Sequence, residues 1–163
     1  MEGNIVPLLH NQWLKRKDEA VMLCEKASKN DVADRYRDCS LFKGTENISE
    51  LISLYKSTQG IEFCTRYHFP ELSIIRRFKN CDLEKYGVYL DAGKVNIKNP
   101  KETVLLIGNT DAVIECSDTH RFVISCLHEA SVTVYASGYA VVSIEAEKGC
   151  KIVKNIKDNA KIL

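Results

Sequence analysis

From residue 130 to residue 163 the sequence reads ASVTVYASGY AVVSIEAEKG CKIVKNIKDN AKIL, and each block of ten opens with a small residue. Two positions after each small residue stands a branched aliphatic residue: Val132, Val142, Ile152 or Ile162. Side chains alternate across a β-strand, so the small residue and the aliphatic residue two positions later lie on the same face. The stretch therefore predicts short strands that recur about every ten residues.

The same rhythm extends back to residue 93 when small or turn-adjacent residues are taken as anchors. These anchors are Gly93, Thr103, Ala112, Arg121, Ala130, Ala140, Cys150 and Ala160. Two positions after each one stands an apolar residue: Val95, Leu105, Ile114, Val123, Val132, Val142, Ile152 or Ile162. Turn-forming pairs such as Gly108-Asn109 and Ser137-Gly138 separate the segments. The sequence thus predicts about eight short strands with tight connections.

Two architectures fit this pattern, and they differ in the direction of neighbouring strands. In a β-solenoid the strands are parallel, two segments form one coil, and Val123 stacks on Val142, Val132 on Ile152 and Ala140 on Ala160. The alternative is an antiparallel meander or small sandwich, in which consecutive segments pair as hairpins. We favour the solenoid because a hairpin stack has no reason to keep a small anchor in the same phase through so many segments.

The first half of the chain has a helical pattern. Apolar residues recur on one face of a predicted amphipathic helix from Asn11 to Lys29. Residues 30–47 are mixed and polar, and we interpret them as a connection. A second helix begins near Asn47, where Asn47 and Glu50 have the spacing of a capping box.

The second predicted helix ends before Phe69-Pro70, because the residue before proline resists α geometry. A third helix follows Pro70 and ends at Asn80, and Gly87 to Asp91 forms the first strand. The fold class is therefore α+β. Residues 1–80 form a helical head, and these helices cap a C-terminal β-solenoid-like stack of short strands in residues 81–163, the β tail; the two parts form one structural unit.

Composition limits the function classes. The chain has 23 basic and 22 acidic residues, a balance that argues against a protein that acts mainly on nucleic-acid phosphates or acidic membranes. We find neither a signal peptide nor an apolar run of about 20 residues, so we expect no membrane partner. Seven cysteines without a CxxC pair suit a reducing compartment. We therefore expect a soluble cytoplasmic protein.

Residues with reactive or metal-binding side chains form no familiar site. Cys64 and His68 have the spacing of a nucleophile and base on a helix, but Cys64 lies on the apolar side and is interpreted as structural. No closed zinc pattern matches the spacing of Cys116, His120, Cys126 and His128. The alternation of side chains along the strands is expected to place Cys126 on the face opposite Cys116. We predict no catalytic residue, cofactor or metal. A β-helix acyltransferase is a poor fit because those enzymes use six-residue repeats.

Basic residues form three candidate surfaces for a partner or a nucleic acid. The candidates are Lys15, Arg16 and Lys17 on the first helix, the run Arg76, Arg77, Phe78 and Lys79 on the third, and Lys151, Lys154 and Lys161 in the last repeats. Phe78 would supply an aromatic ring for base stacking. The alternatives are solvated helix faces for the first two and protection of an exposed sheet edge for the last. Ile162 and Leu163 form a candidate edge interface.

Five segments of the sequence carry a further signal: Leu51–Lys56 (LISLYK), Gly60–Cys64 (GIEFC), Phe69-Pro70, the strand entry at Gly87–Tyr89 and Asp158–Ile162 (DNAKI). Together they resemble a family of small Bacteroidetes proteins associated with mobile elements. The resemblance implies a helical region followed by a repetitive β tail and a phage or prophage setting. It does not extend to the first helix or to residues 30–47, and it assigns no catalytic residue.

These observations lead to two functional hypotheses. The first is a non-enzymatic protein-interaction module, which in the mobile-element setting would inhibit a host defence complex, as an anti-CRISPR protein does. Its partner would be another protein or a second copy of the chain, bound through the open C-terminal β edge. The alternative is an RNA-binding module that uses the basic helices, with an affinity that falls steeply as salt is added.

Overall fold

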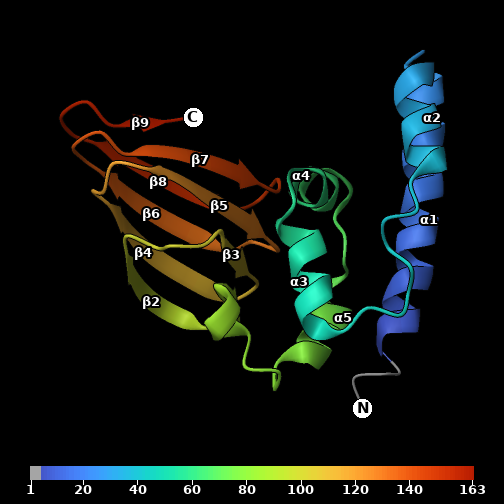
Figure 1. Ribbon diagram of the computed structural model, residues 1–163, viewed down its shortest axis with the longest axis horizontal. Helices are drawn as coiled ribbons and strands as arrows, with labels where there is room; N and C mark the ends of the chain where they lie inside the picture. The colour runs from blue at the N-terminus through green and yellow to red at the C-terminus, as the bar shows by residue number, and fades with distance from the viewer. Residues whose placement is uncertain (1–4) are drawn as a thin grey trace.

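The structure is a computed structural model that describes residues 5–163 (Figure 1). The helices are α1 (Ile5–Lys26), α2 (Asn30–Asp38), α3 (Ile48–Lys56), α4 (Thr58–Tyr67) and α5 (Leu72–Ile75), followed by the 3-10 turns η2 (Arg76–Phe78) and η3 (Leu83–Tyr86). The strands are β1 (Val88–Leu90), β2 (Gly93–Lys98), β3 (Val104–Ile107), β4 (Thr110–Cys116), β5 (Arg121–Leu127), β6 (Ser131–Ala136), β7 (Val141–Ala146), β8 (Lys151–Ile156) and β9 (Lys161–Ile162). The predicted α+β order is confirmed.

The β tail is a parallel β-solenoid, as predicted, and not an antiparallel meander or sandwich. Odd-numbered strands form one sheet in the order β1-β3-β5-β7-β9, here called sheet A, and even-numbered strands form sheet B in the order β2-β4-β6-β8. Every pair is parallel. The chain therefore alternates between the two sheets, and two strands make one coil (Figure 1).

The register confirms part of the predicted stacking and corrects the rest. From Val104 onward each residue pairs with the one twenty positions later, and Val132 pairs with Ile152 as predicted. Val142, however, pairs with Phe122 and not with Val123. The nine-residue spacings assigned before Ala130 were wrong because Ala112, a small residue, occupies the inner position that later coils fill with Val132 and Ile152.

Apolar side chains fill the space between the two sheets. The fully buried members of this cluster include Leu106, Ile114, Cys116, Ile124, Cys126, Val134 and Val142. Cys116 and Cys126 both point into this core, so the predicted outward orientation of Cys126 was wrong. Burial of each large aliphatic side chain contributes about 1.5–3 kcal/mol, which offsets much of the backbone entropy lost in ordering the coils.

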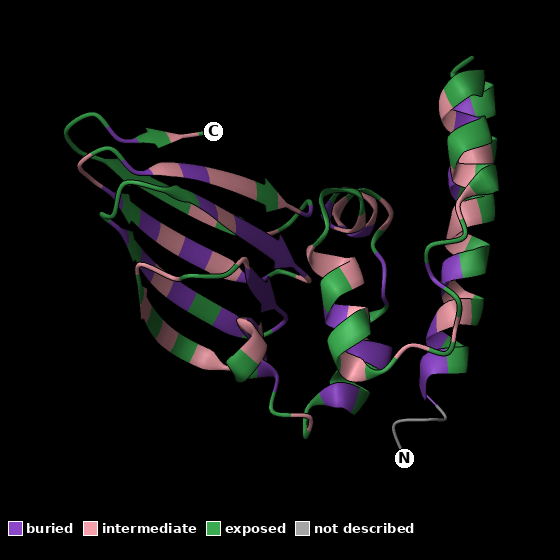
Figure 2. Cartoon of the chain, viewed as in Figure 1, coloured by how far each residue is buried: buried purple, intermediate pink, exposed green. Residues whose placement is uncertain are grey.

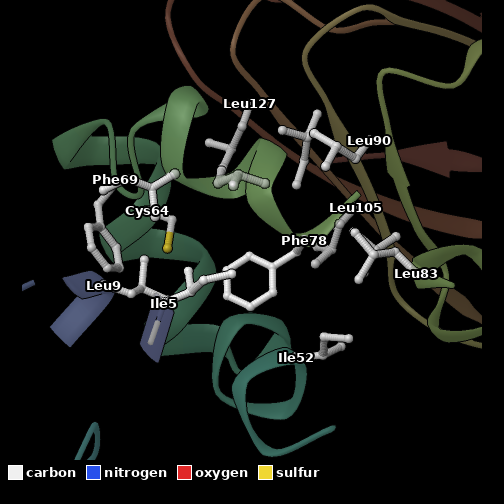
Figure 3. Packing of buried hydrophobic residues seen from close by; sticks show 14 of the residues in the cluster. Ile5, Leu9, Ile52, Cys64, Phe69, Phe78, Leu83, Leu90, Leu105 and Leu127 are labelled. Carbon is white, nitrogen blue, oxygen red and sulfur yellow. The ribbon is translucent and has the colours of Figure 1, made fainter. Parts of the chain in front are cut away.

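The outer face of sheet A is covered by the helical head over its first strands. The outward-facing apolar residues of these strands alternate with the inward-facing ones and belong to a second apolar cluster. They are Val88, Leu90, Leu105, Ile107 and Leu127. The helical side of that cluster includes Ile52, Cys64, Phe69 and Phe78 (Figure 3). The head thus caps the first coils of the solenoid, and residues from both halves share one core.

Local signals explain most of the helix boundaries. Asn47 accepts the Glu50 N–H and the Glu50 side chain accepts the Asn47 N–H, which confirms the predicted capping box. Ser57 then ends α3 and caps α4 by accepting the Gly60 N–H, so one predicted helix is two. Within residues 5–163 no helix has both the length and the apolar character needed to cross a membrane.

The first predicted helix and the predicted connection were only partly right. Helix α1 begins at Ile5, before the predicted start at Asn11, and residues 30–38 of the supposed connection form α2. The two helices lie side by side on the far side of α3 and α4 from the sheets (Figure 1). Figure 2 shows buried positions even on these outermost helices. The buried residues of α1 and α2 include Ala20, Cys24 and Ala33.

Candidate functional site

The last coil of the solenoid differs from the others because nothing in the described chain stacks on it. We call residues 141–163, which contain β7, β8 and β9, the terminal coil. Strands β8 and β9 are the last members of sheets B and A, and each pairs with one strand only within residues 5–163. The open edge predicted at the C-terminal end is therefore present (Figure 1).

One side of β8 has backbone N–H and C=O groups that pair with no strand among residues 5–163. Lys151 N–H donates to Ala130 O, and Lys157 N–H donates to Ala136 O, so the odd-numbered residues of this segment face β6. The peptide groups of a strand alternate in direction, so Ile152, Lys154 and Ile156 turn their N–H and C=O groups away from β6. This row of donors and acceptors can pair with an added strand.

Apolar side chains are also exposed at this end. Among residues 5–163, the large apolar side chains of the β tail that are at least half exposed all lie at or after residue 135: Tyr135, Tyr139, Val153, Ile156 and Leu163. Ile156 is 55% exposed, whereas its pairing partner Ala136 is 2% exposed. Inward-facing residues are buried in the earlier coils, whereas on β8 this row of residues is exposed to solvent.

The terminal coil is strongly basic. The exposed cations are Lys148, Lys151, Lys154, Lys157 and Lys161, and none of them forms an ion pair with any residue from 5 to 163. The single acidic residue after Lys148 is Asp158, whose carboxylate accepts the Gly138 N–H at 3.0 Å. A surface with unpaired backbone groups, exposed aliphatic side chains and unneutralised lysines suits an extended acidic segment of a partner.

Some of the site residues predicted from sequence lie together here and others do not. Lys151, Lys154, Lys161, Ile162 and Leu163 all belong to the terminal coil, where Ile162 is half-buried and Leu163 is 61% exposed. The signal that the sequence reasoning missed is the exposure of Ile156 and Val153. Neither residue is an anchor of the predicted repeat or stands two or four positions after one, so the repeat pattern made no prediction for them.

The basic residues of α1 lie on the helical head, apart from the terminal coil. Lys15 is exposed, and Arg16 pairs with Glu19 and Glu71. Lys17 donates to the Cys39 carbonyl at 3.1 Å and lies over the ring of Trp13. Two of the three predicted cations are therefore occupied by contacts within the fold.

The second basic cluster is also partly structural. Arg76 forms a two-pronged pair with Asp91, at 2.7 Å from Nε and 3.1 Å from Nη2. Phe78 is buried in the core with 7% exposure, so its predicted role as a stacking platform was wrong. The turn of η2 directs Phe78 inward and leaves only Arg77 and Lys79 exposed and outside any ion pair among residues 5–163. Of the predicted run, these two cations remain available for contact with a partner.

The Cys64 thiol does not have the environment of a nucleophile. Cys64 is buried with 4% exposure, and burial, with a further contribution from Glu147, raises the pKa of its thiol far above the ordinary value. His68 contacts the Glu147 carboxylate instead of Cys64. Burial of Cys64 was predicted, and the Cys64–His68 pair lacks the hydrogen bond that nucleophilic catalysis needs.

The four residues considered as zinc ligands have other surroundings in the structure. Cys116 and Cys126 lie in the solenoid core, His120 stacks against Phe122, and His128 contacts the Pro70 carbonyl. Residues 5–163 contain no group of three or more potential metal ligands. Comparisons with protein-family models, curated proteins and solved structures found no match to the chain.

Proposed function

We propose that the protein is a non-enzymatic interaction module that binds an acidic, extended segment of another protein along its terminal coil. The observation that carries the proposal is the coincidence of a free strand edge with uncovered core side chains on β8. Main-chain pairing at such an edge supplies affinity, and pockets for alternate side chains supply selectivity. Ile152 and Ile156 form such a row at the edge of β8.

Charge favours a different protein over a second copy of the chain. In a twofold arrangement two β8 strands would pair antiparallel, which places central Lys154 near its counterpart and brings the lysines of both terminal coils together. Like charges directly opposite one another destabilise a strand pair. An acidic segment instead neutralises Lys151, Lys154 and Lys161, and it gains the apolar contacts with Ile156 and Leu163.

In the mobile-element setting that the sequence resemblance implies, the partner would be a subunit of a host defence complex. An RNA partner has less support, because Arg16, Lys17 and Arg76 are held in contacts within the fold and Phe78 is buried. The distinction is measurable. RNA binding would weaken steeply with salt, whereas binding that depends on strand pairing keeps a large salt-independent part.

The test is a selection of displayed ten-residue peptides against the full chain. We expect enrichment of acidic peptides with aliphatic residues at alternate positions, and at least a tenfold loss of affinity in the double variant Lys151→Glu, Lys154→Glu. The matched control is Lys94→Glu. Lys94 pairs with Asp111, Asp111 with Ser131 and Ser131 with Lys151, so Lys94 holds the equivalent position at the other end of sheet B. A selection without such enrichment, or peptides that bind the double variant equally well, would overturn the proposal.

A further inference from the structure

A cavity of about 440 Å³ lies between the helical head and sheet A, away from the terminal coil. Its lining comes from every layer on that side of the molecule: Trp13 from α1, Tyr36 from α2, Leu51 from α3, Phe63 from α4 and Leu105 from β3. The volume is within the range of small-molecule sites, which is about 300–1,000 Å³. The cavity is independent of the surface proposed for a protein partner.

The lining has charged residues at one end and apolar residues at the other. Its charged members are Lys17, Arg35, Glu62 and Arg66, of which all but Lys17 are exposed. Leu105 and Ile107, from the sheet side, are almost completely buried. The charged residues therefore mark a mouth between the outer helices, and the apolar residues mark the deep end against sheet A. The lining also includes Ile52, Cys64 and Phe78, whose side chains Figure 3 shows in the apolar cluster between the helices and the sheets.

One residue that lines the cavity carries a polar atom without a hydrogen-bond partner in residues 5–163. The Tyr55 hydroxyl is buried, and it makes no hydrogen bond within the described part of the chain. Burial, with Cys64 and Glu147 nearby, raises the pKa of Tyr55 well above its ordinary value, so the hydroxyl keeps its proton and is a donor. A buried donor without an acceptor costs about 1–3 kcal/mol, which a ligand oxygen would recover.

The charges around the cavity favour a neutral ligand. At the mouth, Lys17 donates to the Cys39 carbonyl, Arg35 pairs with Asp31, and Arg66 pairs with Glu62. The Glu147 carboxylate does not line the cavity but is close enough to the Tyr55 hydroxyl to raise its pKa, so a ligand carboxylate beside that hydroxyl would meet a like charge in a poorly solvated place.

We propose that this cavity binds a neutral apolar ligand with one oxygen acceptor, such as a long-chain alcohol or ketone, whose oxygen accepts the Tyr55 hydroxyl. A cavity of about 150 Å³ is enough for benzene, so the available volume corresponds to a ligand of about ten to sixteen carbon atoms. The hydrocarbon part contacts the residues of α3, α4 and β3. The oxygen fixes its orientation at the deep end.

The experiment uses the full chain and the fluorescent probe N-phenyl-1-naphthylamine, which contains no oxygen. We expect saturable probe binding, competition by decan-1-ol, and competition by decanoate that is at least tenfold weaker. The variant Leu51→Trp, which fills the cavity, should weaken probe binding at least tenfold. Leu14→Trp is the matched control, because Leu14 lies on α1 outside the lining.

Tyr55→Phe tests the assignment of the oxygen. It should weaken decan-1-ol about five- to tenfold while probe affinity changes less than twofold, and it should fold normally because the hydroxyl it removes has no partner among residues 5–163. Ile156→Ser should leave probe binding unchanged, which separates the cavity from the apolar terminal coil. Absence of saturable probe binding, equal binding by Leu51→Trp, or an unchanged decan-1-ol affinity in Tyr55→Phe would overturn the proposal.

Discussion

At the residue scale, Glu147 has the least expected role, because it joins the two halves of the chain. Its carboxylate is buried, accepts the His128 N–H at 2.5 Å, and contacts the His68 ring, which follows α4. We expect Glu147→Ala to lower the free energy of unfolding by about 2–4 kcal/mol, because His128 N–H loses its charged acceptor and a cavity remains. Urea denaturation followed by circular dichroism measures the change.

The control for this prediction is Glu145→Ala, two residues earlier on β7 and exposed. It should change the free energy of unfolding by less than about 0.5 kcal/mol. Equal effects of the two substitutions would mean that Glu147 does not join the halves. The sequence gives no warning of this role, because Glu147 stands in a turn pattern with Lys148 and Gly149, where an acid is normally solvated.

A second residue-scale prediction concerns the pair Arg76 and Asp91. The hydrogen bonds from Arg76, helped by the Asn109 N–H, hold the pKa of Asp91 below its ordinary value. A lowered pKa in the folded state stabilises the fold above the unfolded-state pKa of about 3.9, and this contribution is lost as the pH falls through the folded value. Arg76→Met should therefore raise the pKa of Asp91 toward its ordinary value, as measured by NMR titration of the carboxyl carbon.

Arg77→Met serves as the comparison, because Arg77 is exposed and has no ion pair in residues 5–163. It should leave the Asp91 titration unchanged. An unshifted Asp91 in Arg76→Met would contradict the pairing. The pair also shows why a charge reversal at Arg76 is a poor test of partner binding: it would disturb the turn before β2 as well as the surface.

At the element scale, the sequence predicted where the strands lie better than it predicted which residues of successive coils pair with one another. The ten-residue rhythm of Val132, Val142 and Ile152 is regular because inner positions of a solenoid require aliphatic residues of similar size. Before residue 130 the rhythm is obscured, since Ala112 and Phe122 fill equivalent inner positions with very different volumes. Helix α2 was missed because its apolar face is narrow: Ala33 is its one buried residue among the residues described, and most of the other side chains are polar or charged.

The edge strand β8 supports a prediction about self-association. Lys154 occupies an inner row whose preceding member is Val134, and its inward-pointing charge on an edge strand opposes pairing with a second copy of the chain, which carries the same lysine. Lys154→Val would continue the aliphatic row to the edge. We expect this variant to dimerise with a Kd of about 10 µM, or about −7 kcal/mol, while the unmodified chain stays monomeric at that concentration.

Sedimentation velocity over a range of concentrations measures this association. The matched control is Lys151→Val, which removes one lysine from the same strand but on the outer face of sheet B, and it should remain monomeric. A monomeric Lys154→Val variant would show that the lysine does not protect the edge. Association of both variants would instead assign the effect to net charge.

At the scale of the whole molecule, the candidate site was only partly visible in the sequence. The lysines and Ile162 and Leu163 could be placed at the end of the chain, because they follow the last repeat. The cavity around Tyr55 could not be foreseen, since α1, α3, α4 and β3 contribute to it and lie far apart in sequence. Tertiary packing alone brings them together.

The shared core leads to a prediction about cooperativity. Trp13 is the single tryptophan of the chain and lies in the helical head with 8% exposure, so its fluorescence reports on that half, whereas circular dichroism near 218 nm reports mainly on the sheets. Residues of the sheets and of the head pack in one cluster, which includes Leu105, Ile107 and Leu127 from the sheets and Trp13, Ile52 and Phe78 from the head. Both signals should therefore change at the same urea concentration. Residues 81–163 expressed alone would expose that face of sheet A and should aggregate or remain unfolded. Two separate transitions, or a soluble and folded β tail, would show that the halves are independent domains and that the cluster between them contributes little to stability.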